Sequence, residues 1–141
     1  RVQKFTPTGG FITWGGSRGA GIGQFNHPYG IAIHPTNGLV YVADTGNHRI
    51  QKFSPDGVYL ATIGREGQGP GEFTFPGSLD IDGSGELVVV SPYGMKIQFL
   101  DGSGVGSSGI NLRRDGAGTL GISVNEKTTR AHIEALLRAF R

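Results

Sequence analysis

A nine-residue segment occurs twice in this chain of 141 residues, at positions 1–9 and 49–57. The copies read RVQKFTPTG and RIQKFSPDG, so Arg49 repeats Arg1 at a distance of 48 residues. A fixed period of this length is typical of arrays of supersecondary units, each of which buries its apolar face only against a neighbour. The same period relates further pairs: Phe25 and Phe73, Pro28 and Pro76, Ile33 and Ile81, and Leu39 and Leu87.

The composition is that of a β protein rich in turns, with 26 glycines, 7 prolines and 36% hydrophobic residues. The absence of cysteine excludes disulfides and thiolate metal sites. No apolar run approaches the roughly 20 residues that cross a bilayer, so we expect no membrane partner. The chain begins at Arg1 without an initiator methionine or a signal peptide, and we expect it to be a fragment or a fusion.

The charge is divided unevenly along the chain. Residues 1–105 carry 7 basic and 8 acidic side chains, whereas residues 106–141 carry 6 and 3. A repeat array that binds nucleic acid through phosphates needs a basic surface of its own. Binding of nucleic acid by residues 1–105 is therefore not expected.

Four strands can be placed within one period. Asn37 and Gly38 form a hairpin signal between two apolar runs, and further turns follow at 44–48 and 55–57. The predicted strands cover residues 30–33, 39–43, 49–53 and 58–63. Four antiparallel strands in a period of this length describe one blade of a β-propeller.

The residues of this period resemble the NHL repeat. The resemblance rests on FNHPYGIAI at 25–33 and on LVYVADTGNHRIQKF at 39–53, including the D-x-x-N-x-R-I pattern. It implies about two blades over residues 1–101, an incomplete propeller ring. A second copy begins at 73–77, but its turn departs from the pattern, with Pro92, Tyr93 and Met95 near the places of Asp44, Thr45 and Asn47.

The residues of the repeat motif are interpreted as structural. Asp44 and Asn47 can bond backbone groups of their turn, and Arg49 can bond neighbouring carbonyls or carboxylates. Pro28 and Gly30 complete the motif at the start of the first strand. A motif needed in every blade fits a folding requirement better than a ligand contact.

Several apparent sites fail on their context, and we expect no catalytic, cofactor or metal site. The glycine tracts at 19–23 and 67–71 open no helix and recur at one place in the period, so both are predicted to be interblade loops. The G-x-S-x-G match at 15–19 leads into more glycine instead of a helix. The segment 80–85 starts like a calcium loop but lacks its final glutamate, which predicts a hairpin turn. Turn histidines are more often solvent-facing than ligands, and this applies to His27, His34 and His48.

The composition changes at 102–109, a Gly/Ser-rich linker. Beyond it, strands are predicted at 110–114 and 119–124. Thr128 or Thr129 can cap a helix whose apolar residues follow a helical spacing. These are Ile133, Leu136, Leu137 and Phe140. The fold class is therefore all-β, with four-stranded antiparallel blades followed by a ββα tail at 110–141.

The tail resembles a short segment of the glycine-cleavage P-protein, the decarboxylating glycine dehydrogenase. The match covers INLRR at 110–114, GTLGISVNEKTT at 118–129 and IEALL at 133–137. In that family the segment belongs to a subdomain of a pyridoxal-phosphate fold. The segment here holds neither the cofactor lysine nor a phosphate loop, and Lys127 is not assigned as that lysine, so no cofactor is expected.

Two functional classes remain open. The first is a non-catalytic propeller module that binds a protein or peptide through its interblade loops. The second is a fragment of a pyridoxal-phosphate-dependent glycine dehydrogenase of the glycine cleavage system. The extent of the repeat favours the first. An isolated pair of blades leaves apolar faces and strand edges open, so self-association is also expected.

Overall fold

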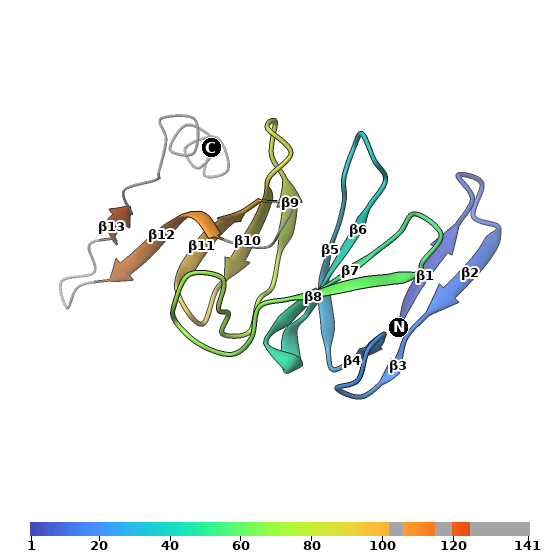
Figure 1. Cartoon of the computed structure of the whole chain (residues 1–141), viewed down its shortest axis with the longest axis horizontal. Coiled ribbons are helices and arrows are strands. Elements are labelled where there is room, and N and C mark those ends of the chain that lie inside the picture. The colour runs from blue at the N-terminus through green and yellow to red at the C-terminus, as the bar shows by residue number, and fades with distance from the viewer. Residues whose placement is uncertain (102–105, 115–119, 125–141) are drawn as a thin grey trace.

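The computed structural model describes residues 1–101, 106–114 and 120–124, and these residues form sheets that follow one another along the molecule (Figure 1). The first is the hairpin β1 (Val2–Phe5) and β2 (Phe11–Gly15). The central sheet contains β5 (Pro28–Ile33), β6 (Val40–Asp44), β7 (Arg49–Phe53) and β8 (Tyr59–Ile63). The last sheet contains β9 (Leu79–Ile81), β10 (Leu87–Ser91), β11 (Lys96–Leu100), β12 (Gly106–Arg114) and β13 (Leu120–Val124).

The prediction of an all-β fold is confirmed. Every neighbouring pair in the three sheets is antiparallel, and the central sheet has the order β5-β6-β7-β8. A short 3-10 turn, η1 (Thr45–Asn47), joins β6 to β7. Within the described residues no helix is long and apolar enough to cross a membrane.

The hairpin β1–β2 is the counterpart of β7 and β8, 48 residues earlier. A loop then leads to the central sheet through the short parallel pair β3 (Ser17–Arg18) and β4 (Gln24–Phe25). The loop before the last sheet contains the matching parallel bridge between Glu66 and Phe73. The predicted glycine-rich interblade loops therefore share one backbone course, with φ of 153° at Gly19 and 156° at Gly67.

One correspondence drawn from the sequence is wrong by a residue. In the ladders, Val40 lies opposite Phe53 and Leu87 lies opposite Leu100, so Leu87 is the counterpart of Val40 and not of Leu39. The cause is the hairpin between the first two strands, which spans residues 34–39 in one sheet and 82–86 in the other. From this point the repeat distance is 47 residues, and Ser91 takes the place of Asp44.

The tail strands extend the last sheet. Strand β12 pairs with β11 as β8 pairs with β7, and β13 pairs with the outer edge of β12. The two strands predicted at 110–114 and 119–124 are thus present, and residues 106–109 of the expected linker lie in β12. The helix predicted from Thr128 or Thr129 lies outside the described residues.

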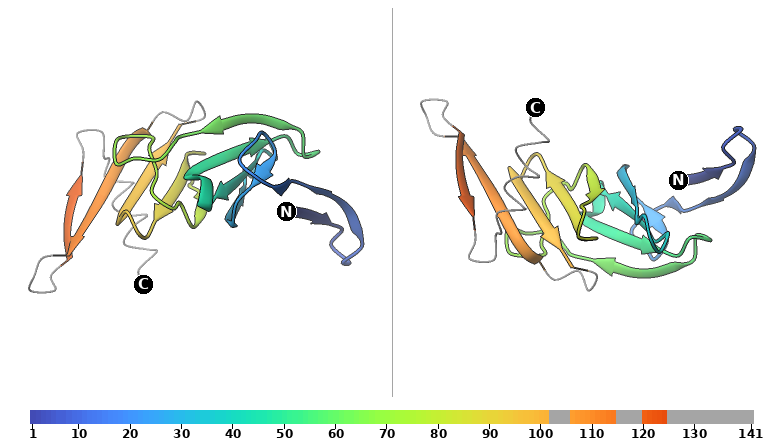
Figure 2. Two further views of the ribbon diagram at one scale, coloured as in Figure 1. Left: turned by 90° about the horizontal axis from the view of Figure 1, so that it is seen from below. Right: turned by 90° about the horizontal axis from the view of Figure 1, so that it is seen from above.

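The core lies between the central and last sheets, which are adjacent in both views of Figure 2. From the central sheet and its following loop come Ala32, Tyr41, Ala43, Ile50, Ile63 and Phe73. From the last sheet come Leu87, Val89 and Leu100. The sheets approach so closely at Gly30 that a β-carbon there would overlap the carbonyl oxygen of Gly77.

Gly30→Ala is expected to lower the free energy of unfolding by about 1–3 kcal/mol, because it forces the two sheets apart. Gly83→Ala is the matched control, since a β-carbon at Gly83 meets no atom of the described residues within 4 Å. That change should be neutral or slightly stabilising through the unfolded chain. Urea unfolding of both variants checks the prediction, and equal stabilities would contradict close sheet packing at Gly30.

Candidate functional site

The carboxylate of Asp44 is the centre of a buried polar network at the end of β6. Asp44 is fully buried. Its Oδ1 accepts a hydrogen bond from the backbone N–H of Asn26 at 2.6 Å. Its Oδ2 accepts from Asn47 Nδ2 at 2.9 Å, Arg49 Nε at 2.7 Å and Gln51 Nε2 at 3.1 Å. The buried charge is therefore matched by one guanidinium and three further donors.

The same three side chains also hold the glycine-rich loop that precedes the sheet. Because Asn47, Arg49 and Gln51 each bond both Asp44 and this loop, the loop and the sheet share one network. Asn47 Nδ2 donates to the carbonyl of Gly19 at 2.9 Å. Arg49 Nη2 donates to the carbonyls of Gly21 at 2.7 Å and Gln24 at 3.1 Å. Gln51 Nε2 donates to the carbonyl of Gln24 at 2.6 Å, and Gln51 Oε1 accepts from the N–H of Gly23 at 2.9 Å. Pro28 lies opposite Asp44 in the β5–β6 ladder, so the motif residues named from the sequence gather at this end of the sheet.

The last sheet keeps this arrangement in reduced form. Ser91 stands in the place of Asp44, and its buried Oγ has no hydrogen-bond partner among the residues that the structure describes. Lys96 stands in the place of Arg49 and donates from Nζ to the carbonyls of Gln68 and Gly69. Gln98 is the counterpart of Gln51: its Oε1 accepts from the N–H of Gly71, and its Nε2 donates to the carbonyl of Glu72.

The loss of the carboxylate changes the electrostatics of this second network. Burial lowers the pKa of Lys96, and the negative charge of Glu72 opposes that shift. Glu72 accepts from the N–H of Gly69 at 3.0 Å and from Arg65 Nε at 2.9 Å. The Gly69 bond first, and then the Arg65 bond, lower the pKa of Glu72 below its usual value of 4.5. A loop carboxylate here partly supplies the charge that Asp44 supplies in the central sheet.

Within the described part of the chain, four non-glycine residues have left-handed backbone conformations, and they form two equivalent pairs. His27 and Phe75 precede the proline of each repeat, with φ of 49° and 48°. His48 and Met95 precede the third strand, with φ of 53° and 48°. Such conformations cost free energy and persist only where the surrounding structure imposes them.

Three of the aromatic side chains at these turns pack in a row, which we call the aromatic ladder: His48, Phe75 and Tyr93. The ring centroids of His48 and Phe75 are 4.2 Å apart, and those of Phe75 and Tyr93 are 5.7 Å apart. The N–H of Phe75 donates to His48 Nδ1 at 3.2 Å, which leaves Nε2 facing Glu66 at 3.9 Å. Tyr93 is 81% exposed and Phe75 41%, so the ladder presents an aromatic surface to solvent.

Sequence reasoning missed this ladder and interpreted its histidine differently. The His48 side chain is only 15% exposed and bonded, not solvent-facing. His27 bonds Asn26 Oδ1, and His34 bonds Thr36, so the three histidines are not brought together. Over 1–101, 106–114 and 120–124, no three side chains of the metal-binding types converge. In the segment 80–85, which resembled the start of a calcium loop, Asp82 Oδ1 instead accepts hydrogen bonds from the backbone N–H groups of Ser84 and Glu86 within a hairpin turn.

Antiparallel sheets recur along the chain, and the central and last sheets are each tied by polar side chains to a preceding glycine-rich loop, an arrangement that supports a module of the β-propeller type. Residues 25–53 match the NHL repeat family, and this match confirms the resemblance inferred from the sequence. A 32-residue segment is 69% identical to a protein named glycine dehydrogenase (decarboxylating) from Jannaschia sp. (strain CCS1). That match covers 23% of this chain and only 3% of the relative, and it is consistent with the resemblance of the tail.

Replacement of Asn47 or Arg49 by alanine is expected to lower the free energy of unfolding by about 1–3 kcal/mol, because buried acceptors lose their donors. Tyr93→Ala should cost less, since Tyr93 is 81% exposed. Ser91→Ala should be near neutral because the hydroxyl bonds none of the described residues. Denaturant unfolding followed by circular dichroism measures all four. If Asn47→Ala left the free energy of unfolding unchanged but abolished binding of a partner, the structural interpretation would be wrong and this turn would be a recognition site.

Proposed function

We propose that this chain is a non-catalytic β-propeller module that binds a protein or peptide through its interblade loops. The observation that carries the proposal is the aromatic ladder, which is formed by the turn before β7, the segment before β9 and the turn before β11. Aromatic side chains combine large contact area with few rotatable bonds, and they are enriched at protein interfaces. The strained backbone at His48 and Phe75 supports a surface whose shape is set in advance.

The electrostatics support a polypeptide ligand over a nucleic acid. Residues 1–105 carry nearly equal numbers of basic and acidic side chains, which provides no excess positive charge for phosphates. Glu66 lies 3.9 Å from His48 Nε2 at one end of the ladder, and its side chain is 74% exposed. A peptide with apolar or aromatic anchors and a mixed polar rim matches this surface.

In this proposal the Asp44 network is scaffolding. Asp44, Asn47 and Arg49 bond one another and the loop backbone, and Pro28 and Gly30 shape the start of β5. Their polar atoms are directed at the protein itself, which leaves recognition to the exposed rings beside them. The isolated chain should also self-associate, since Ile31, Ile33 and Leu60 are each about half exposed or more.

Selection of a random peptide library on the immobilised chain tests the binding face. We expect enriched peptides that lose at least about tenfold in affinity to Phe75→Ser and Tyr93→Ser variants, a loss typical of anchor residues. Val58→Ser, a change at a 62% exposed apolar residue outside the ladder, is the control and should bind normally. Peptides that bind all three variants equally would place recognition elsewhere.

A second candidate, a fragment of glycine dehydrogenase, is favoured by the 69% identity over 32 residues. The described lysines are engaged elsewhere: Lys4 donates to the carbonyl of Pro55, Lys52 lies over the Tyr41 ring at 5.7 Å, and Lys96 is buried against two loop carbonyls. We therefore derive no chemistry from that cofactor. Lys127 lies outside the described residues.

Addition of pyridoxal phosphate tests this alternative. We expect neither a stoichiometric new visible absorbance band nor release of carbon dioxide from glycine. A band that forms stoichiometrically and disappears in Lys127→Ala would support the enzyme fragment against the interaction module. Lys127→Arg serves as the charge-matched control.

A further inference from the structure

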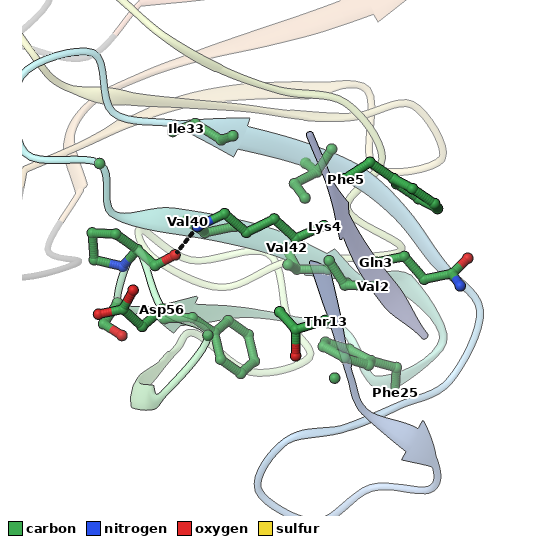
Figure 3. Close-up of a pocket in the computed structure, with 17 residues that line it drawn as sticks. Val2, Gln3, Lys4, Phe5, Thr13, Phe25, Ile33, Val40, Val42 and Asp56 are labelled. Carbon is green, nitrogen blue, oxygen red and sulfur yellow. Dashed lines mark hydrogen bonds between the residues drawn. The ribbon is translucent and has the colours of Figure 1, made fainter. Parts of the chain in front are cut away.

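The proposed function leaves a pocket and a polar turn without a role. The pocket, of about 480 Å³, lies between the hairpin β1–β2 and the central sheet (Figure 3). Its walls are mainly apolar, and Lys4 Nζ donates to the carbonyl of Pro55 at 3.0 Å beside it. The polar turn, which we call the Ser91 turn, runs from Ser91 to Lys96 and joins β10 to β11. In this turn a buried polar group lacks the partners that its counterpart in the central sheet has.

The Ser91 turn keeps the backbone of its counterpart in the central sheet but not two of the polar side chains. The residue before the third strand is left-handed in both copies, with φ of 53° and 48°. Ser91 takes the place of Asp44 in the ladder. Gly94 takes the place of Asn47, three residues later in each copy. A hydroxyl and a hydrogen atom thus stand where the central sheet has a carboxylate and an amide.

The hydrogen-bond donors around the missing carboxylate are retained. Ser91 is 2% exposed, and its Oγ bonds none of the described residues. In the central sheet the Asp44 carboxylate accepts from the backbone N–H of Asn26, and the counterpart of that amide belongs to Thr74. A β-carbon built at Gly94 would lie 3.6 Å from Cβ of Thr74 and 3.7 Å from Cβ of Ser91. These three residues therefore border one small space, in which a single group can accept from both donors.

The surroundings of the Ser91 turn also carry more positive than negative charge. Lys96 lies opposite Ser91 in the ladder, is 7% exposed, and donates from Nζ to two loop carbonyls. These bonds use two of the three donors of the ammonium group and supply no negative charge. The nearby carboxylate of Glu72 is itself bonded to Arg65 Nε at 2.9 Å, so two cations share one carboxylate. In the central sheet one guanidinium meets one carboxylate.

The chemistry of this position selects a class of ligand. A hydroxyl, a backbone N–H and an ammonium group are all donors, which favours an acceptor that carries no hydrogen of its own. The charge of Lys96 disfavours a cation, and water supplies no opposite charge. A divalent anion exceeds the single unmatched positive charge and is costlier to desolvate. The absent side-chain atoms leave room for a few atoms only.

We propose that the Ser91 turn binds a small monovalent anion, a halide or a carboxylate of the size of acetate, in the place that the Asp44 carboxylate occupies in the central sheet. The anion accepts from Ser91 Oγ and from the Thr74 N–H, and it opposes the charge of Lys96. It thereby joins the segment before β9 to the turn before β11, and both of these carry rings of the aromatic ladder. The site does not depend on peptide binding by the ladder.

Amide chemical shifts of the full chain, measured by NMR, test the site with sodium chloride and sodium acetate as separate probes. Each salt replaces sodium gluconate at constant ionic strength, because gluconate is too large for the space. We expect a saturable shift of the Thr74 amide and none of the Asn26 amide, whose acceptor is already the Asp44 carboxylate. A response to chloride supports a halide site, and a response to acetate supports a carboxylate site. The absence of a saturable Thr74 shift with either probe would overturn the proposal.

Three variants separate a bound anion from a general effect of salt. Ser91→Asp supplies the carboxylate covalently and should abolish the saturable Thr74 shift. Ser78→Asp adds the same charge at an exposed serine and should retain it. Ser91→Ala should weaken the apparent affinity by at least about tenfold, the effect of one hydrogen bond to a charged group. Equal titration curves for the three variants would overturn the proposal.

Denaturant unfolding gives a second readout. An anion that binds only the folded chain raises the folding equilibrium constant by the factor 1 + [anion]/Kd, about elevenfold at ten times Kd. This gain should disappear in Ser91→Asp and persist in Ser78→Asp, whereas Ser91→Ala should be near neutral in gluconate. A gain of equal size in Ser91→Asp would contradict the site. Failure of peptide selection while the Thr74 amide still titrates would contradict the proposed function alone, so the two proposals fail independently.

Discussion

The burial of the Asp44 carboxylate imposes most of the order seen in the central sheet. A carboxylate without access to water is stable only if its oxygens are fully bonded and its charge is opposed. Here the opposing charge and most donors come from the turn and strand that follow, at Asn47, Arg49 and Gln51. Because these side chains also bond the preceding loop, one buried charge aligns a turn, two strands and a loop.

The last sheet shows what remains when that charge is absent. Ser91 and Lys96 keep the positions of Asp44 and Arg49 in the ladder, since the backbone pairing does not require the side chains. The loop is still held, but through Lys96 and Gln98 alone, with Glu72 contributing charge from the loop side. Both networks therefore share a glutamine, Gln51 in the central sheet and Gln98 in the last sheet. The ion pair between Arg49 and Asp44 belongs to the central sheet.

An exposed aromatic surface remains once the scaffold of the central sheet has been accounted for. The aromatic ladder is a row of rings held by short turns, suited to side-chain recognition.

The sequence by itself indicated the approximate period, the main strands and turns, and Asp44, Asn47 and Arg49 of the polar network, because these depend on local patterns or on repetition. It did not indicate Gln51, whose contacts with Asp44 and the loop appear only in the folded chain. It failed where a single-residue change in a hairpin altered the register, as at Leu87, since only the ladder records which residues lie opposite one another. The tertiary structure alone decided that residues 106–109, glycine- and serine-rich like a linker, join β11, because strand pairing uses backbone groups that composition does not report. It also decided the aromatic ladder, whose members are 18 to 27 residues apart and meet only when neighbouring sheets pack.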